Sequence, residues 1–88
     1  MGKEITGLIT FKSTHHTIQA EEFFRNRSIS FKTVPTPREI TRSCGLAIMF
    51  SLDHIHMVKE MIDKGEINID SVYEYIKDGT SRHAEKII

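Results

Sequence analysis

Cys44 is the single cysteine of the chain, and its side chain is the one best suited to covalent chemistry. It follows the stretch Pro35 to Ser43, which holds both prolines and two arginines, and it precedes Gly45 and an apolar run. A thiolate is a strong nucleophile, and nearby positive charge lowers the pKa of a cysteine thiol. Arg38 and Arg42 could supply that charge, while Gly45 removes side-chain bulk beside the sulfur. These features support the hypothesis that Cys44 is a partly exposed thiolate.

A second polar group precedes this stretch. Ser13 and Thr14 offer side-chain oxygens that could cap a helix, and Thr14, His15 and His16 open a segment with helical periodicity. The N–H groups of a first helical turn attract anions, and a charged imidazole would add positive potential. Adjacent histidines lie about a quarter-turn apart on a helix, so they cannot both face Cys44. Together with Cys44 they match no closed zinc pattern. We therefore expect no metal.

Each candidate also has a purely structural interpretation. Free cysteines are often buried, and Cys44 has the strand parity of Ile48 on the expected core face. Arg38 could form a weak surface ion pair with Glu39, and Arg42 could pair in the same way. Residue type and spacing alone leave both interpretations of these side chains open.

The elements that must position these residues follow from hydrophobic periodicity. Period-two patterns predict strands, and periods near 3.6 predict helices. The strands are expected at 5–11, 29–34, 44–50 and 67–76, and the helices at 14–27 and 54–64. This order predicts an α+β, ferredoxin-like βαββαβ fold, a four-stranded antiparallel sheet with both helices on one face. We expect one domain over residues 1–77 and a polar, frayed C-terminal tail over 78–88.

That topology brings separated segments to one edge of the sheet. The first helix begins where the first strand ends, and the second strand ends where the third begins. His15, His16, the loop Pro35 to Ser43 and Cys44 should therefore converge there, with the cysteine directed toward the helix layer. The opposite sheet face should be open and should carry Leu8, Ala47 and Met49, so it could mediate dimerisation.

Composition limits the classes of function. Lysine plus arginine and aspartate plus glutamate number 12 each, so the formal net charge is zero, which disfavours a broad nucleic-acid binder. No apolar run approaches the length of a membrane span, and the N-terminus has no signal-peptide pattern. A lone cysteine cannot form an internal disulfide. We therefore expect a cytoplasmic protein with a reduced thiol and no membrane partner.

Three motifs together resemble a family of small bacterial proteins, the selenium/sulfur carrier protein-like family. They are Ser13 to His16 after the opening strand, Val34 to Ile40, and Ser43 to Ala47, and the resemblance spans roughly Ile5 to Tyr75. It implies that Cys44 carries sulfur or selenium as a persulfide-type adduct. It further implies donor and acceptor partner proteins, and a carrier rather than a turnover enzyme. A carrier of this kind needs no organic cofactor.

On this interpretation a small set of groups would stabilise the terminal anion of the adduct. They are Thr14, His15, His16, Arg38, Arg42 and Gly45. The alternatives are a non-catalytic interaction or dimerisation module that uses the open sheet face, and a regulatory ligand-binding domain. Nucleic-acid binding through the sheet is disfavoured, because the third strand lacks an aromatic pair.

Overall fold

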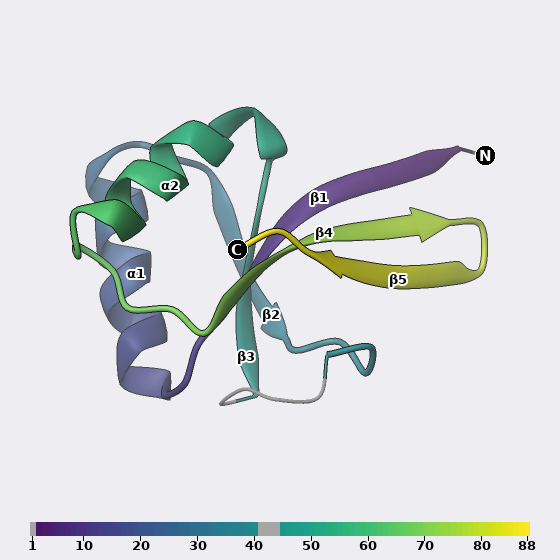
Figure 1. The fold of residues 1–88 in the computed structure, drawn as a ribbon, viewed down its shortest axis with the longest axis horizontal. Coiled ribbons are helices and arrows are strands. Elements are labelled where there is room, and N and C mark those ends of the chain that lie inside the picture. The colour runs from purple at the N-terminus through teal and green to yellow at the C-terminus, as the bar shows by residue number, and fades with distance from the viewer. Residues whose placement is uncertain (1, 41–44) are drawn as a thin grey trace.

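A computed structural model describes residues 2–40 and 45–88 of the chain. Along the chain a strand and a helix are followed by two strands, a second helix and two further strands (Figure 1). The elements are β1 (Lys3–Thr10), α1 (Thr14–Asn26), β2 (Phe31–Pro35), β3 (Leu46–Phe50), the 3-10 helix η1 (Leu52–His54), α2 (Ile55–Asp63), β4 (Ser71–Asp78) and β5 (Ser81–Lys86). The α+β class with two helices and an antiparallel sheet is therefore confirmed.

The sheet has five strands, not the four predicted. Its order is β2-β3-β1-β4-β5, and every neighbouring pair is antiparallel. It departs from a simple ferredoxin-like sheet through β5, which adds to the outer edge of β4. The prediction that residues 78–88 form a frayed tail was wrong, because Asp78 ends β4 and residues 81–86 form β5. Figure 1 shows β1, β4 and β5 reaching beyond the helices as an arm.

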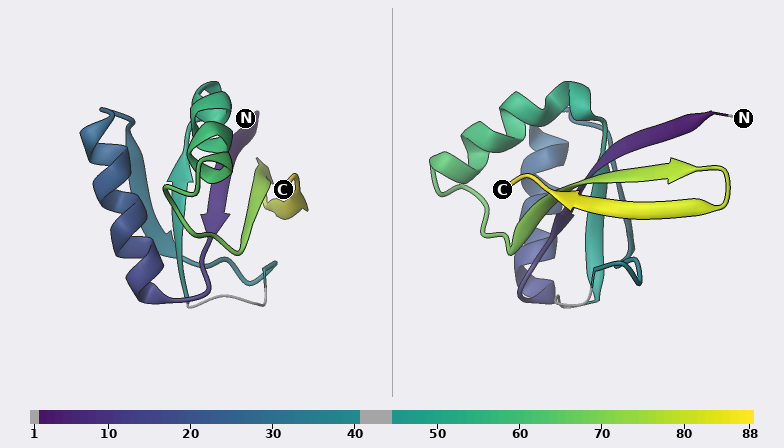
Figure 2. Two further views of the ribbon diagram at one scale, coloured as in Figure 1. Left: turned by 60° about the vertical axis from the view of Figure 1, so that its left-hand side comes forward. Right: turned by 45° about the vertical axis from the view of Figure 1, so that its right-hand side comes forward.

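Both helices cover one face of the sheet. Ala20 and Phe24 of α1, with Val58 and Met61 of α2, join a single buried cluster with inward-facing strand residues. The Phe24 ring packs edge-on against two other aromatic rings, with its centroid 5.6 Å from that of Phe31 and 6.2 Å from that of Phe50. In the left view of Figure 2, β5 lies at the far side of the molecule from α1. The helix layer thus covers the sheet on the side of α1 and leaves the arm uncovered.

The face without helices, called here the helix-free face, is not open as predicted. Leu8 and Ala47 are completely buried there, packed with Tyr75 and Ile40. Ile40 comes from the segment that follows β2, and its side chain is only 7% exposed. That segment therefore covers part of the sheet, and only the remainder of the face meets solvent.

Close packing explains one glycine within the sheet. Gly7 of β1 pairs with Phe50 of β3, and a Cβ at position 7 would lie 2.4 Å from the Phe50 ring. Real side chains do not approach so closely, so glycine is required for the ring to lie over β1. This contact fixes Phe50 against the core and holds β3 in register with β1.

Candidate functional site

The edge predicted to carry the site is formed by strand ends that meet in register. Thr10, the last residue of β1, pairs with Ala47, and Pro35, the last of β2, pairs with Leu46, the first of β3. The turn into α1 leaves β1 at this same edge, which is the lower edge of Figure 1. The end of β1, the end of β2 and the start of β3 therefore converge as the topology predicted.

Two of the predicted site residues, Arg42 and Cys44, lie outside the described residues. The expected direction of the cysteine side chain relied on a strand that begins at Cys44. In the structure β3 begins at Leu46, and the preceding Gly45 is exposed with φ +98°. Only glycine adopts that conformation readily. Strand alternation therefore holds from Leu46 onward and cannot be extended back to Cys44.

The first turn of α1 is capped as its sequence predicts. The Ser13 hydroxyl accepts a hydrogen bond from the His16 backbone N–H at 3.3 Å, and the Thr17 hydroxyl donates to the Ser13 carbonyl. Thr14 and His15 are exposed, His16 is half-buried, and the two imidazole rings are 6.2 Å apart. The N–H groups of Thr14 and His15 have no acceptor within the helix, because a first turn leaves them unpaired. This end of α1 therefore presents positive potential at the edge.

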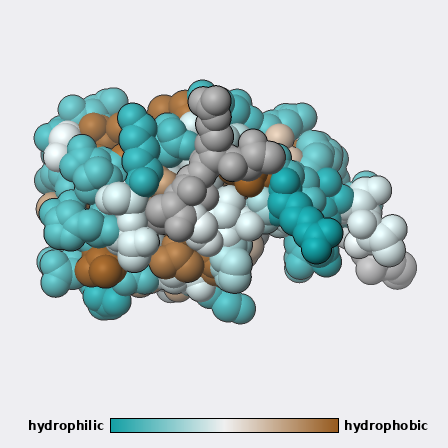
Figure 3. Space-filling model, turned by 90° about the horizontal axis from the view of Figure 1, so that it is seen from below, coloured by the Kyte–Doolittle hydropathy of each residue, from teal (hydrophilic) through white to brown (hydrophobic). Residues whose placement is uncertain are grey.

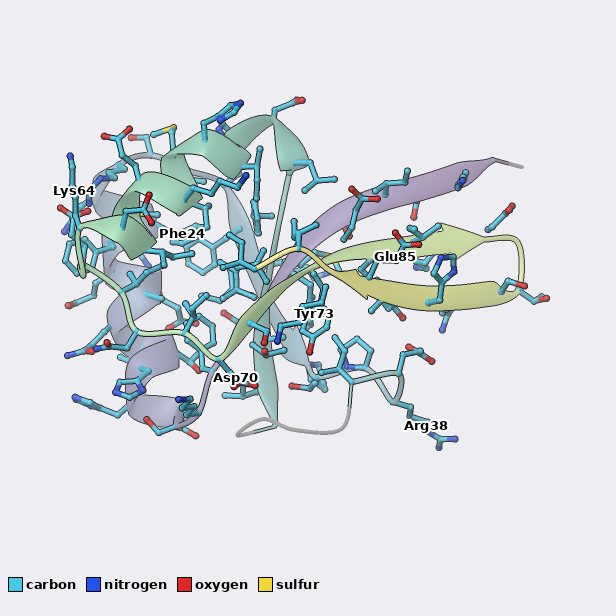
Figure 4. All side chains as sticks on the ribbon, in the orientation of Figure 1. Phe24, Arg38, Lys64, Asp70, Tyr73 and Glu85 are labelled. Carbon is cyan, nitrogen blue, oxygen red and sulfur yellow. The ribbon has the colours of Figure 1, made fainter. Side chains whose placement is uncertain are left out.

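Arg38 lies elsewhere, on the side of the sheet away from α1. It belongs to a tight turn in which the Ile40 N–H donates to the Pro37 carbonyl at 3.0 Å, and this turn packs on the helix-free face through Ile40. The Arg38 side chain is exposed and points into solvent, as Figure 4 shows. The structure therefore does not bring Arg38 to the N-terminus of α1, because the sheet separates the two groups.

The carboxylate beside Arg38 has a different partner from the one proposed. The Tyr75 hydroxyl donates a hydrogen bond of 3.1 Å to Glu39 Oε1, across 36 residues of sequence. Burial, this hydrogen bond and the charge of Glu39 raise the pKa of Tyr75 above its ordinary value of 10.0, while nearby Arg82 lowers it. The contact ties the turn after β2 to the middle of β4. Nothing local in the sequence marks this contact, because its two residues lie far apart in the chain.

The two ends of the segment that contains Cys44 are held together. The Thr36 N–H donates to the Gly45 carbonyl at 3.0 Å, which continues the pairing of β2 with β3 by one step. The chain therefore leaves the sheet at Thr36 and returns at Gly45. Between these points it is anchored by Ile40 and by the contact of Glu39 with Tyr75.

The surrounding surface is mainly polar. Figure 3, which looks onto this edge from below, shows hydrophilic residues with a few separate hydrophobic patches. Within residues 2–40 and 45–88, no three His, Cys, Asp or Glu side chains lie close enough to hold a metal ion. In the same part of the chain, neither helix is long and apolar enough to cross a membrane.

Comparison with known protein families gave one finding. Residues 6–74 match the model of the family described as "Putative Se/S carrier protein-like". The match spans both segments that flank Cys44 and includes the cysteine itself. A search of curated proteins and a search of solved structures gave no match.

Proposed function

The chain belongs to the Se/S carrier protein-like family, and from this premise we propose that it carries sulfur or selenium on Cys44 between a donor protein and an acceptor protein. The observation that carries the proposal is the family match over residues 6–74, which contains the single cysteine of the chain. Carriage of this kind is group transfer without net turnover. On this proposal the protein acts as a carrier and not as an enzyme.

The transfer consists of two exchange steps. The Cys44 thiolate attacks the outer sulfur of a donor persulfide, a new S–S bond forms at Cys44, and the donor leaves as a thiolate. A nucleophile of the acceptor, such as a second thiolate, then attacks the outer sulfur and releases the Cys44 thiolate. Both steps exchange one S–S bond for another, so no oxidant or reductant is consumed. Selenium in place of the outer sulfur follows the same steps.

The groups assigned from the sequence to stabilise the adduct anion come from two regions of the chain, the start of α1 and the residues on either side of Cys44. Arg42 and Gly45 are close to Cys44 in the chain, and the first turn of α1 begins at the same edge as β3. We propose that these groups, with Thr14, His15 and His16, favour the thiolate and the adduct anion over their protonated forms. Arg38 points to solvent beyond the sheet, so we assign it at most a long-range contribution to the potential.

The anchored segment supports this role physically. Its ends are closed by the bond between Thr36 and Gly45, and its middle is held by Ile40 and Glu39. A carrier must offer one sulfur to two different proteins, and the described residues on both sides of Cys44 are held to the sheet by these contacts. The proposal includes a cytoplasmic location, where a single thiol stays reduced.

The experiment is to incubate the protein with a polysulfide, and separately with a cysteine desulfurase and cysteine, and to measure intact mass. We expect an increase of one sulfur atom that a reducing agent removes. Cys44→Ser should gain nothing, and the tryptic peptide that contains position 44 should carry the added mass. A protein that stays unmodified with both donors would contradict the proposal.

A further inference from the structure

The helix-free face carries a row of residues in register across all five strands. The row runs Lys32, Met49, Leu8, Tyr73 and Lys86, from β2 through β3, β1 and β4 to β5. Both lysines are exposed, and they end the row at opposite edges of the sheet. Four strand spacings of about 4.8 Å separate them by about 19 Å at the backbone.

More cations surround this row on the same face. In the arm, Lys77 of β4 lies opposite Glu4 of β1 and opposite Arg82 of β5, so these three side chains are on one face of the sheet. It is the helix-free face, because the charge of Arg82 acts on the Tyr75 hydroxyl. Arg38 projects from the turn that packs on this face. Besides Glu4, the acid on this face is Glu39, and its carboxylate already accepts a hydrogen bond from the Tyr75 hydroxyl.

The fold therefore separates charges that cancel in the composition. On the helix-free face five cations stand against two carboxylates; they are Lys32, Arg38, Lys77, Arg82 and Lys86, against Glu4 and Glu39. The rest of the described chain holds six lysines and arginines and ten aspartates and glutamates. A neutral protein thus has one face with a surplus of positive charge, which composition alone could not reveal.

The part of this face that meets solvent also has an apolar centre. Val34, Met49 and Tyr73 are partly exposed, and they pack against the buried cluster formed by Leu8, Ala47 and their neighbours. An apolar centre with a charged rim is the usual anatomy of a protein–protein interface. Lys32 and Lys86 lie in the row beside Met49 and Tyr73, so they form part of that rim.

We propose that the helix-free face is a docking surface for a partner protein with an acidic surface patch. Tyr73 and Met49 would meet apolar groups of the partner, and Lys32, Lys77, Arg82 and Lys86 would pair with its carboxylates. This proposal goes beyond the carrier function, because it requires no chemistry at Cys44.

Two observations favour a protein over a single-stranded nucleic acid as the occupant. Nucleic-acid binding on a sheet needs successive exposed aromatic rings on which bases stack. Tyr73 is partly exposed, but Tyr75 is 7% exposed and its hydroxyl is bonded to Glu39. The turn that contains Ile40 also occupies the space over Leu8 and Ala47 where further bases would lie.

The test uses a defined acidic probe, a peptide of about 14 residues with glutamates flanking a Leu-Phe centre, which is long enough as a helix to span the row. The peptide is titrated into isotope-labelled protein, and amide shifts are recorded by NMR. We expect shifts confined to β2, β3, β4 and β5 on the helix-free face, and an affinity that falls as salt is raised. A peptide with lysine in place of glutamate should not bind.

Charge reversal supplies the matched control. Lys32→Glu with Lys86→Glu should weaken the acidic peptide roughly tenfold, because both exposed cations become repulsive. Lys12→Glu with Lys59→Glu makes the same change in net charge at exposed positions outside this face and should leave affinity unchanged. Thermal melting establishes that each variant is folded, and Lys32→Gln with Lys86→Gln is a milder replacement should the reversal unfold the protein.

Three results would overturn the proposal. They are absence of peptide binding, an equal loss of affinity in both charge-reversed variants, and tighter binding of a ten-nucleotide oligouridylate than of the acidic peptide at the same face. The last result would make the face a nucleic-acid site. None of them bears on loading of Cys44 from polysulfide, so failure of this proposal and failure of the carrier proposal can be told apart.

Discussion

Removing the Tyr75 hydroxyl tests how firmly the turn before Cys44 is fixed to the sheet. Tyr75→Phe keeps the ring in its buried cluster and deletes only the hydrogen bond to Glu39. Hydrogen bonds to charged groups contribute about 1.5–3 kcal/mol when buried. Glu39 is an exposed residue whose carboxylate water can hydrate once the bond is lost, so we expect a loss nearer about 1 kcal/mol.

The assay is equilibrium urea unfolding of a double-mutant cycle at neutral pH. Tyr75→Phe and Glu39→Ala should each destabilise the protein, and the double variant should lose little more than either, which gives a coupling energy of about 0.5–1.5 kcal/mol. Tyr73→Phe is the matched control, because Tyr73 lies two residues away on the same face and its hydroxyl bonds to no residue of the described chain. It should change stability little.

The pH dependence of the free energy of unfolding is a second test, and its direction follows from the pKa of Tyr75. The pKa of Tyr75 is raised in the folded protein above the ordinary value of 10.0, chiefly by burial and then by Glu39. Its contribution to stability is therefore complete below pH 10 and is lost as pH rises through the raised pKa. Tyr75→Phe should lose less stability than wild type over that alkaline range. A coupling energy below about 0.3 kcal/mol, or parallel alkaline profiles, would refute the role assigned to this contact.

Two further changes test the packing and the fifth strand. Gly7→Ala should destabilise the protein by about 1–3 kcal/mol in urea unfolding, because the new Cβ meets the Phe50 ring and forces it to move, whereas an unchanged midpoint would mean that the ring is not fixed there. Deleting residues 80–88 exposes the edge of β4 that pairs with β5 and removes the backbone hydrogen bonds of Val72 with Ile87 and Ile88. The deletion should therefore lower the melting temperature and promote association that light scattering detects. If these residues were a frayed tail, their deletion would change neither the melting temperature nor the light scattering.

Local sequence signals predicted most of the elements but not all of their ends. The Ser13 cap and the helical periodicity placed the start of α1 at Thr14, where the structure has it. The start of β3 was predicted two residues early, because the apolar alternation from Leu46 could be extended back through Gly45 without contradiction. The positive φ of Gly45 is a backbone property that the alternation pattern does not encode.

The features that sequence analysis missed depend on tertiary context. β5 contains four charged or histidine side chains in six residues, and only Ala84 is half-buried, so it lacks the apolar alternation that marks a strand. It forms because the edge of β4 offers a ladder of unpaired backbone groups. The contact of Glu39 with Tyr75, and the cover that Ile40 provides for Leu8, join segments far apart in the chain.

The site was predicted as one cluster, and among its described residues the structure separates Arg38 from the first turn of α1. Strand order correctly brought the ends of β1 and β2 to the start of β3, because antiparallel topology determines which ends meet. It could not say on which side of the sheet the turn of Arg38 would pack. That choice depends on Ile40, whose burial against Leu8 and Ala47 draws the turn to the helix-free face.

The most direct test of the carrier proposal asks which sulfur of the loaded protein an acceptor attacks. Wild-type protein is loaded from polysulfide with isotopically labelled sulfur, freed of excess donor and mixed with a thiol acceptor peptide, and all products are identified by mass. We predict that the label moves to the acceptor as a persulfide while Cys44 returns to its thiol. A mixed disulfide between Cys44 and the acceptor, with the label released as hydrosulfide, would show attack at the inner sulfur and would contradict a transfer role.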